Sequence, residues 1–486
     1  MNRRFFVKAV SSALGAGMVN TLSRTTGWTA GSARNVRAGS GAPTYMQGNA
    51  GQARSIQAGD ETVRSGGARI YTLFFATAPS TDDADLEPVS HEELIHRLRR
   101  DCEGVEFDVR DLTRSARLQS VLNEMKELQR LGYDGVMVYG WPRDYDVLRT
   151  GLPTINIAIV NDFMNNPFPI YAKNRVVPAF LDPWKFSRSP EAIEAMYNDL
   201  VGKIKLIKAL KKMRGSTLLT VTDSPFVNVM YGDRLKNPPQ NYNEIMAGAI
   251  LETFGVNVIK IGSDEVCENP DIKKLWSERS ARANELAKEW IRNAEKMINT
   301  LEEEVVKSAK CYLAMRTLME QYGAVAMAFH IRTLKKDPRP EEQVYPALAT
   351  SEFQKNGIVA KCQSHLNIVL SEMILQYAYG IPSMLGDFEV DPYNNTSIIQ
   401  HCEGPWNPWG GNKTVPYIIT DHRERRVRGR SQPGVGAASW IFYPADEPVT
   451  IWQVDVLRKE ILLHTGETIP IYREESLYRN HLWEMM

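Results

Sequence analysis

Residues 217–261 decide the fold class. An apolar run, Thr217-Leu-Leu-Thr-Val221, is followed by a helical pattern over 243–254 and then by Val256-Asn-Val-Ile-Lys-Ile261. The two runs are short, apolar and partly β-branched, which is typical of buried strands. The helical pattern ends at Gly255, and glycine is the usual residue just beyond the end of a helix. A strand, a helix and a second strand in this order predict parallel strands joined by a crossover helix.

The same alternation continues on both sides of this unit. Toward the N-terminus we predict strands over 70–75, 105–109, 135–140 and 154–160, with helices over 92–100 and 118–131. Toward the C-terminus we predict helices over 190–213, 271–299, 301–322 and 366–379, and strands over 324–329, 358–362 and 382–385. Beyond Asp387 the sequence is mostly strand and loop. The pattern predicts an α/β protein with two Rossmann-like, doubly wound domains, over 68–170 and 171–344, and a third domain over 345–486.

Composition narrows the class of protein. The chain has 486 residues, of which 43% are hydrophobic and 24% charged, and its 58 basic and 58 acidic side chains give no net charge. This composition is typical of a globular protein with several domains. A neutral chain provides no long-range attraction for nucleic acid, and no apolar run approaches the ~18–20 residues of a membrane-spanning helix. We therefore expect neither a nucleic-acid partner nor a membrane span.

The N-terminal segment differs from the rest of the chain. Residues 1–69 carry nine basic and two acidic side chains, and Arg3-Arg4-Phe5-Phe6 precedes a mild apolar stretch over 9–22. This order resembles a twin-arginine export signal, which predicts a periplasmic protein. The alternative is an ordinary basic N-terminus and a cytoplasmic protein. Because 31–67 contains almost nothing to bury, we interpret 1–67 as signal and disordered linker.

Several classes of site lack sequence support. The chain has no GxxxxGK[ST] phosphate loop, no GxGxxG after a strand, no HExxH and no GxSxG. These absences give no basis for a nucleotide-binding, zincin or α/β-hydrolase interpretation. The five cysteines include no CxxC pair, so we expect neither a disulfide scaffold nor a structural zinc site. Cys362 and Cys402 are interpreted as small, buried apolar groups.

Polar side chains follow three predicted strands in the last third of the chain. Gln363 and His365 stand between a strand and a helix, Asp387 follows the next strand, and His401 ends the one after. Strand ends at one edge of a sheet converge, so an oxygen donor, a carboxylate and an imidazole could hold a Mn²⁺- or Mg²⁺-type cation there. The alternatives are a core histidine at His401, a turn or cap at Asp387 and a surface position for His365.

These residues also carry a resemblance to a known family. Residues 357–367, the helix end at 375–382, Gly386-Asp387 and His401-Cys402 resemble the L-fucose/L-arabinose isomerase-like family. Residues 135–140 and 148–154 are similar to its first domain, and residues 464–469 to its late C-terminal part. The resemblance implies two Rossmann-like domains followed by a C-terminal α+β domain that contains a β-barrel. It implies that this domain, 345–486, stops short of the family's closing strand, whose histidine has no clear counterpart.

The family resemblance also implies a reaction. It implies aldose–ketose isomerisation of a pentose or deoxyhexose with Mn²⁺ or a similar divalent cation, in a homo-oligomer that is a trimer or a hexamer. By this resemblance Gln363, Asp387 and His401 are metal ligands, and Gln363, Asp387 and His365 are catalytic. Gln363 replaces a glutamate, and a neutral amide cannot act as a general base. The alternatives are a carbohydrate-binding homologue without isomerase activity and a metal-dependent lyase or epimerase that uses His365 as its base.

Overall fold

The structure is a computed structural model that divides into two compact units, 1–211 and 212–486, and each unit is described by itself. The residues described are 67–75, 90–113, 118–140, 145–157, 175–181, 189–229, 237–278, 280–391, 393, 395–427, 430–441 and 443–469. Apart from Gly67, the predicted signal and linker over 1–67 lie outside the described residues.

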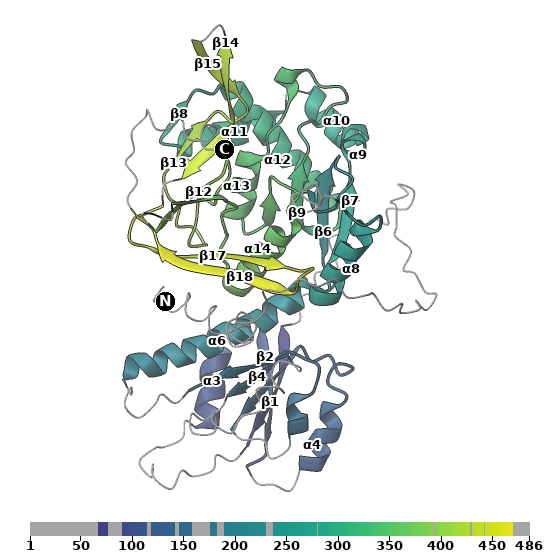
Figure 1. The fold of residues 1–486 in the computed structure, drawn as a ribbon, viewed down its shortest axis with the longest axis vertical. Helices are drawn as coiled ribbons and strands as arrows, with labels where there is room; N and C mark the ends of the chain where they lie inside the picture. The colour runs from purple at the N-terminus through teal and green to yellow at the C-terminus, as the bar shows by residue number, and fades with distance from the viewer. Residues whose placement is uncertain are drawn as a thin grey trace. The chain divides into compact units, whose positions relative to one another are not determined.

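The first unit contains a five-stranded parallel sheet in the order β2-β1-β3-β4-β5. Its strands are β1 (Ala68–Phe74), β2 (Val105–Asp111), β3 (Gly135–Tyr139), β4 (Thr154–Ile157) and β5 (Val176–Ala179). Its helices are α3 (His91–Asp101), α4 (Leu118–Met125) and α6 (Pro190–Met213), with a short 3₁₀ helix over Tyr145–Leu148 (Figure 1). This strand order is that of a doubly wound, Rossmann-like fold. The sheet includes β5, which lies beyond position 170.

The second unit contains a four-stranded parallel sheet in the order β10-β9-β6-β7. Its strands are β6 (Thr217–Thr222), β7 (Asn257–Ile261), β9 (Ala324–His330) and β10 (Val359–Lys361). Its helices are α8 (Tyr242–Phe254), α9 (Ser263–Glu268), α10 (Pro270–Ser277), α11 (Ala281–Asn293), α12 (Glu302–Tyr322), α13 (Ala347–Lys355) and α14 (Leu366–Tyr379), with a 3₁₀ helix over Pro340–Glu342. The predicted unit over 217–261 is confirmed, and Gly255 ends α8 with a φ of 69°.

The remaining strands form smaller sheets. Strand β8 (Lys296–Ile298) joins β13 (Tyr417–Thr420) and β16 (Ala438–Ile441) in a three-stranded sheet. The other strands form three antiparallel hairpins: β11 (Asp387–Asp391) with β12 (Thr396–Gln400), β14 (Arg423–Val427) with β15 (Arg430–Val435), and β17 (Pro448–Asp455) with β18 (Glu460–Glu467). In the described residues these strands form separate small sheets instead of the closed barrel that the family resemblance implies.

Three predicted elements differ from the structure. The helix predicted over 271–299 is wrong: Ser280 accepts a hydrogen bond from the backbone of Ala283 and starts a new helix there, and 296–298 is a strand. The helix predicted over 118–131 ends at Met125, before a turn. The strand predicted over 382–385 is absent, and Asp387 instead begins β11. Proline at position 382 has no N–H to donate to a strand ladder.

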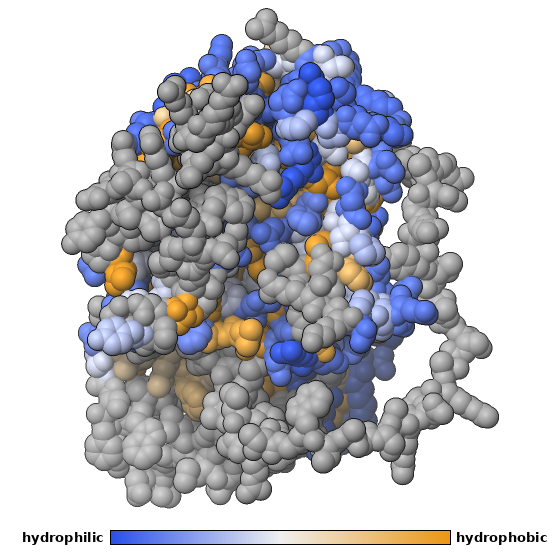
Figure 2. Space-filling model, turned by 45° about the horizontal axis from the view of Figure 1, so that its top comes forward, coloured by the Kyte–Doolittle hydropathy of each residue, from blue (hydrophilic) through white to orange (hydrophobic). Residues whose placement is uncertain are grey.

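Each unit has its own apolar core. In the second unit, Trp290 and Phe353 are buried between the sheet and helices α11 to α13, and Trp406 packs against them from the loop after β12. On the face drawn in Figure 2, the described surface is mostly hydrophilic, with apolar side chains in small groups. Among the described helices, none combines the length and the apolar character needed to cross a bilayer.

Candidate functional site

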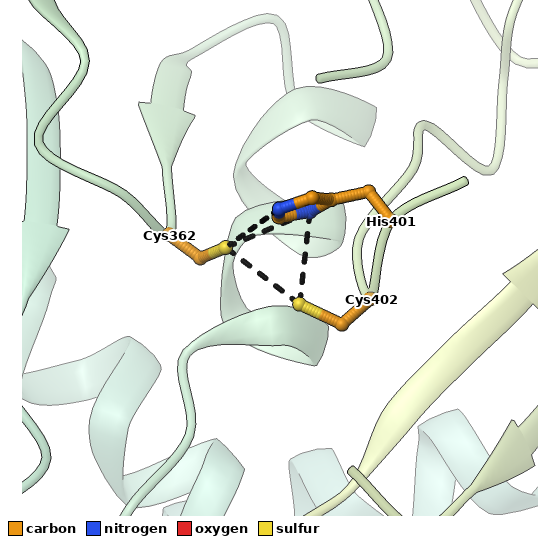
Figure 3. Close-up of side chains that lie close together, drawn as sticks. All are labelled: Cys362, His401 and Cys402. Carbon is orange, nitrogen blue, oxygen red and sulfur yellow. Dashed lines mark hydrogen bonds between the residues drawn. The ribbon is translucent and has the colours of Figure 1, made fainter. Parts of the chain in front are cut away.

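Two segments of the second unit meet at the carboxyl end of β10. The chain leaves β10 at Lys361 and passes through Cys362 and Gln363 before α14 begins at Leu366. The hairpin β11–β12 returns the chain to this point, where His401 and Cys402 directly follow β12 (Figure 3). The carboxyl ends of parallel strands are the usual position for ligands in open α/β sheets. The juxtaposition therefore lies where a functional site is expected.

Two thiols and one imidazole lie in mutual contact. The sulfurs of Cys362 and Cys402 are 3.7 Å apart. His401 Nδ1 lies 3.7 Å from the sulfur of Cys362 and 3.6 Å from that of Cys402. These three side chains are the one group within the described residues whose His, Cys or acidic ligand atoms cluster closely enough to hold a metal ion. All three point toward a common centre (Figure 3).

The exposure of the cysteines separates this pair from the others. Cys362 and Cys402 are partly exposed, whereas the other three cysteines, Cys102, Cys267 and Cys311, are buried. Cys362 and Cys402 are therefore not fully buried residues, which differs from their interpretation as small, buried apolar groups.

The three groups strongly influence each other's ionisation. Burial lowers the pKa of His401, but the negative charges of Cys402, Glu403 and Asp387 outweigh it and raise that pKa to about 9. A hydrogen bond from the Cys362 thiol, opposed by burial and aided by His401, holds the pKa of Cys402 well below its usual value. Burial raises the pKa of Cys362 well above the ordinary value. These shifts favour the charged forms of Cys402 and His401 and the neutral form of Cys362.

A buried ionic group contacts the backbone that carries the cluster. The Lys361 ammonium lies 2.5 Å from a Glu372 oxygen and 3.7 Å from a Glu403 oxygen, and it donates a 2.6 Å hydrogen bond to the carbonyl of Ser383. All three charged side chains are 1% exposed or less. The other oxygen of Glu403 accepts a 2.9 Å hydrogen bond from the backbone N–H of Cys362. Because Glu403 follows Cys402 directly, this bond ties the two cysteine-bearing segments together.

Two carboxylates share this single buried cation. Burial raises the pKa of Glu372, and Lys361 only partly offsets the rise, so the pKa reaches about 7. A buried carboxylate of this kind gains or loses a proton near neutral pH.

The structure brings two of the predicted site residues, Gln363 and His401, into contact. The amide nitrogen of Gln363 lies 3.1 Å from His401 Nε2, on the ring nitrogen that does not face Cys402. Asp387 is exposed and pairs in register with residue 400 across the hairpin, one position before His401. Its charge reaches the imidazole, but it is not one of the three groups of the cluster. His365 precedes α14, and its backbone N–H donates to the carbonyl of Gln363 at 2.9 Å.

Sequence reasoning missed the two cysteines. The absence of a CxxC pair argued against cysteine ligands, but here the two thiols come from segments 40 residues apart in the chain. One signal was present in the sequence: each cysteine lies at a predicted strand end, and Cys402 directly follows a candidate metal ligand.

Comparison with known proteins provides no family assignment. No protein-family model matches the chain, and no curated protein matches it either. The chemistry of the site is therefore argued from its own geometry.

Proposed function

We propose that this protein is a metal-dependent enzyme that interconverts the aldose and ketose forms of a pentose or deoxyhexose. The observation that supports the proposal is the 3.1 Å contact between Gln363 and His401, which belong to segments 38 residues apart. Asp387 lies one strand position away, at the start of β11. The family resemblance implies a site from these same three residues, and the contact between two of them supports the proposal.

The reaction moves a proton and a carbonyl between two neighbouring carbons. One carbon loses its proton, an enediol forms, and the proton is returned to the other carbon, so that C1 is reduced as C2 is oxidised and no external oxidant is needed. In such a reaction a bound divalent cation, Mn²⁺ or a similar ion, polarises the two sugar oxygens. The Gln363 amide both donates and accepts hydrogen bonds, which suits a sugar hydroxyl, but it does not take up a proton.

The proton transfer then falls to other groups. Asp387 carries an exposed carboxylate at the start of β11, and His365 directly precedes α14. Either side chain has the chemistry of a general base, whereas Gln363 has not. We propose Asp387 as the base because it pairs across the hairpin with residue 400, one position before His401.

A second candidate function is a carbohydrate-binding protein of the same fold that does not isomerise its ligand. The observation that favours it is the amide at Gln363, where the family resemblance implies a glutamate. We further propose a homo-oligomer, a trimer or a hexamer, that is exported by a twin-arginine-type signal. Light scattering of the purified protein and fractionation of expressing cells test these two points.

A sugar screen with two variants separates the candidate functions. The purified protein, supplied with divalent cations, is incubated with a panel of pentoses and deoxyhexoses, and ketose formation is measured. An isomerase converts at least one sugar, loses turnover in Asp387→Asn, and keeps it in Glu285→Gln, an exposed carboxylate on α11. A gain of turnover in Gln363→Glu supports an enzyme weakened at this position. Sugar binding by calorimetry without any ketose refutes the isomerase proposal and supports the binding protein.

A further inference from the structure

We propose that Cys362, Cys402 and His401 bind one zinc ion through two thiolates and an imidazole nitrogen, and that Gln363 is a positioning residue that orients the imidazole. This inference revises the metal of the proposed function, because zinc held by two cysteines and His401 replaces a manganese ion held by Gln363, Asp387 and His401. It rests on that function only for the catalytic role of the ion, because binding is measured without turnover.

The distances between the ligand atoms are those of a tetrahedral zinc site. Zinc–sulfur bonds of about 2.3 Å and zinc–nitrogen bonds of about 2.0 Å, at tetrahedral angles, separate two sulfurs by about 3.8 Å and a sulfur from a nitrogen by about 3.6 Å. The observed separations are 3.7 Å between the sulfurs, and 3.7 and 3.6 Å from the sulfurs to Nδ1. All three agree within about 0.2 Å, the tolerance expected of a metal site.

The donor set selects the kind of metal. Two thiolates and an imidazole are soft or borderline ligands, which suit Zn²⁺, whereas Mn²⁺ prefers carboxylate and carbonyl oxygens. The cluster therefore does not fit the manganese that the family resemblance implies. Three protein ligands also leave a fourth tetrahedral position open, as in catalytic zinc sites.

The imidazole needs one adjustment to bind the ion. The sulfur of Cys362 lies 3.7 Å from Nδ1 but also 3.9 Å from Nε2, so the Nδ1 lone pair is not yet directed between the sulfurs. The terminal torsion of histidine is broad, and rotation about it turns Nδ1 toward the centre of the cluster at little cost.

Gln363 then has a role that does not require a carboxylate. With Nδ1 on the metal, Nε2 carries the proton, and the side-chain amide 3.1 Å away offers an oxygen acceptor after a half-turn of its end group. A partner on the second ring nitrogen is what fixes the tautomer and orientation of metal-binding histidines. Below the cluster, Glu403 holds the backbone of Cys362 in place.

Cobalt is the probe for the experiment, since its spectrum reports thiolate ligands. The reduced, chelator-treated protein is titrated with Co²⁺, and the bound cobalt is then displaced with Zn²⁺ or with a large excess of Mn²⁺. We expect one equivalent of cobalt with thiolate-to-metal charge-transfer absorption, displacement by Zn²⁺, and no displacement by Mn²⁺. Because this measurement uses the wild-type chain, it decides the proposal even if a variant fails to fold.

Variants assign the ligands. Cys362→Ser and Cys402→Ser are expected to lose the charge-transfer band, whereas Cys267→Ser, a buried thiol on α9, keeps it. Gln363→Ala is expected to weaken zinc binding about tenfold to 100-fold, and Gln363→Glu to restore it, because a carboxylate also accepts from Nε2. Circular dichroism of each variant checks its fold.

Distinct outcomes overturn the inference. A cobalt spectrum without thiolate absorption, tighter binding of Mn²⁺ than of Zn²⁺, or rapid alkylation of Cys402 that zinc does not slow refutes the zinc site. The last result would indicate a nucleophilic cysteine paired with His401. Ketose formation with Mn²⁺ but without zinc binding refutes this inference and keeps the proposed function. Zinc binding without ketose formation supports this inference and refutes the proposed function.

Discussion

Replacing Lys361 with methionine tests the buried ionic group that supports the site. Lys361 and its two carboxylate partners are 1% exposed or less, so water cannot replace the lost cation. Removing one partner of a buried ion pair costs about 3–5 kcal/mol, because an uncompensated charge stays in the interior. We expect Lys361→Met to lower the free energy of unfolding by this amount at about pH 8, where Glu372, with a pKa of about 7, is largely ionised.

Urea unfolding followed by tryptophan fluorescence measures the change, with the slope of the transition checked for each protein. The double variant Lys361→Met/Glu372→Gln removes one of the two unpaired carboxylates and should regain a large part of the loss. The control is Lys288→Met, an exposed lysine on α11, which should shift stability by less than about 0.5 kcal/mol. A loss below about 1 kcal/mol in Lys361→Met is the size expected of an exposed pair and would refute the reasoning.

Three further predictions concern the second unit. The pKa of Glu372 is raised from 4.5 to about 7 in the folded protein. The contribution of this shift to the free energy of unfolding is therefore complete below about pH 4.5 and is lost as the pH rises through 7. The contribution amounts to about 3 kcal/mol. Urea unfolding across that range should show a weaker pH dependence for Glu372→Gln, and an unchanged dependence contradicts the assignment. Trp406 is 2% exposed and stacks on Tyr417 with ring centroids 4.5 Å apart. Trp406→Ala should therefore lower the free energy of unfolding by about 3–5 kcal/mol in the same assay. A loss below about 1 kcal/mol would show that the ring is not part of the core. Gly255 has a φ of 69°, and a Cβ there would lie 2.9 Å from the Arg214 side chain. Gly255→Ala should therefore lower the free energy of unfolding by at least about 1 kcal/mol. Unchanged thermal unfolding would show that the turn relaxes freely.

Local patterns in the sequence predict the elements of the fold where the pattern and the tertiary structure agree. The helices over 190–213 and 366–379 have the predicted bounds, because their apolar spacing and end signals are both local. The segment 271–299 was misjudged for a non-local reason. Residues 296–298 become a strand only because they pair with β13, about 120 residues later in the chain.

The same distinction applies to the site. Gln363 and His401 were predicted to lie together because both stand at predicted strand ends, and the family resemblance connects them as well. The position of Cys402 beside Cys362 depends on the reversal of the chain in the hairpin β11–β12. His401 directly precedes Cys402, but no other member of the cluster lies near either cysteine in the sequence. Helical and strand periodicity do not encode such a contact, so only the tertiary structure identifies it.

X-ray absorption at the zinc edge of the zinc-loaded protein tests the central claim most directly, because it reports the ligand atoms and their distances without turnover. The cluster of Cys362, His401 and Cys402 predicts two sulfur ligands at about 2.3 Å and lighter ligands at about 2.0–2.1 Å, one of them an imidazole nitrogen. A first shell made only of oxygen and nitrogen would contradict the assignment of both thiols.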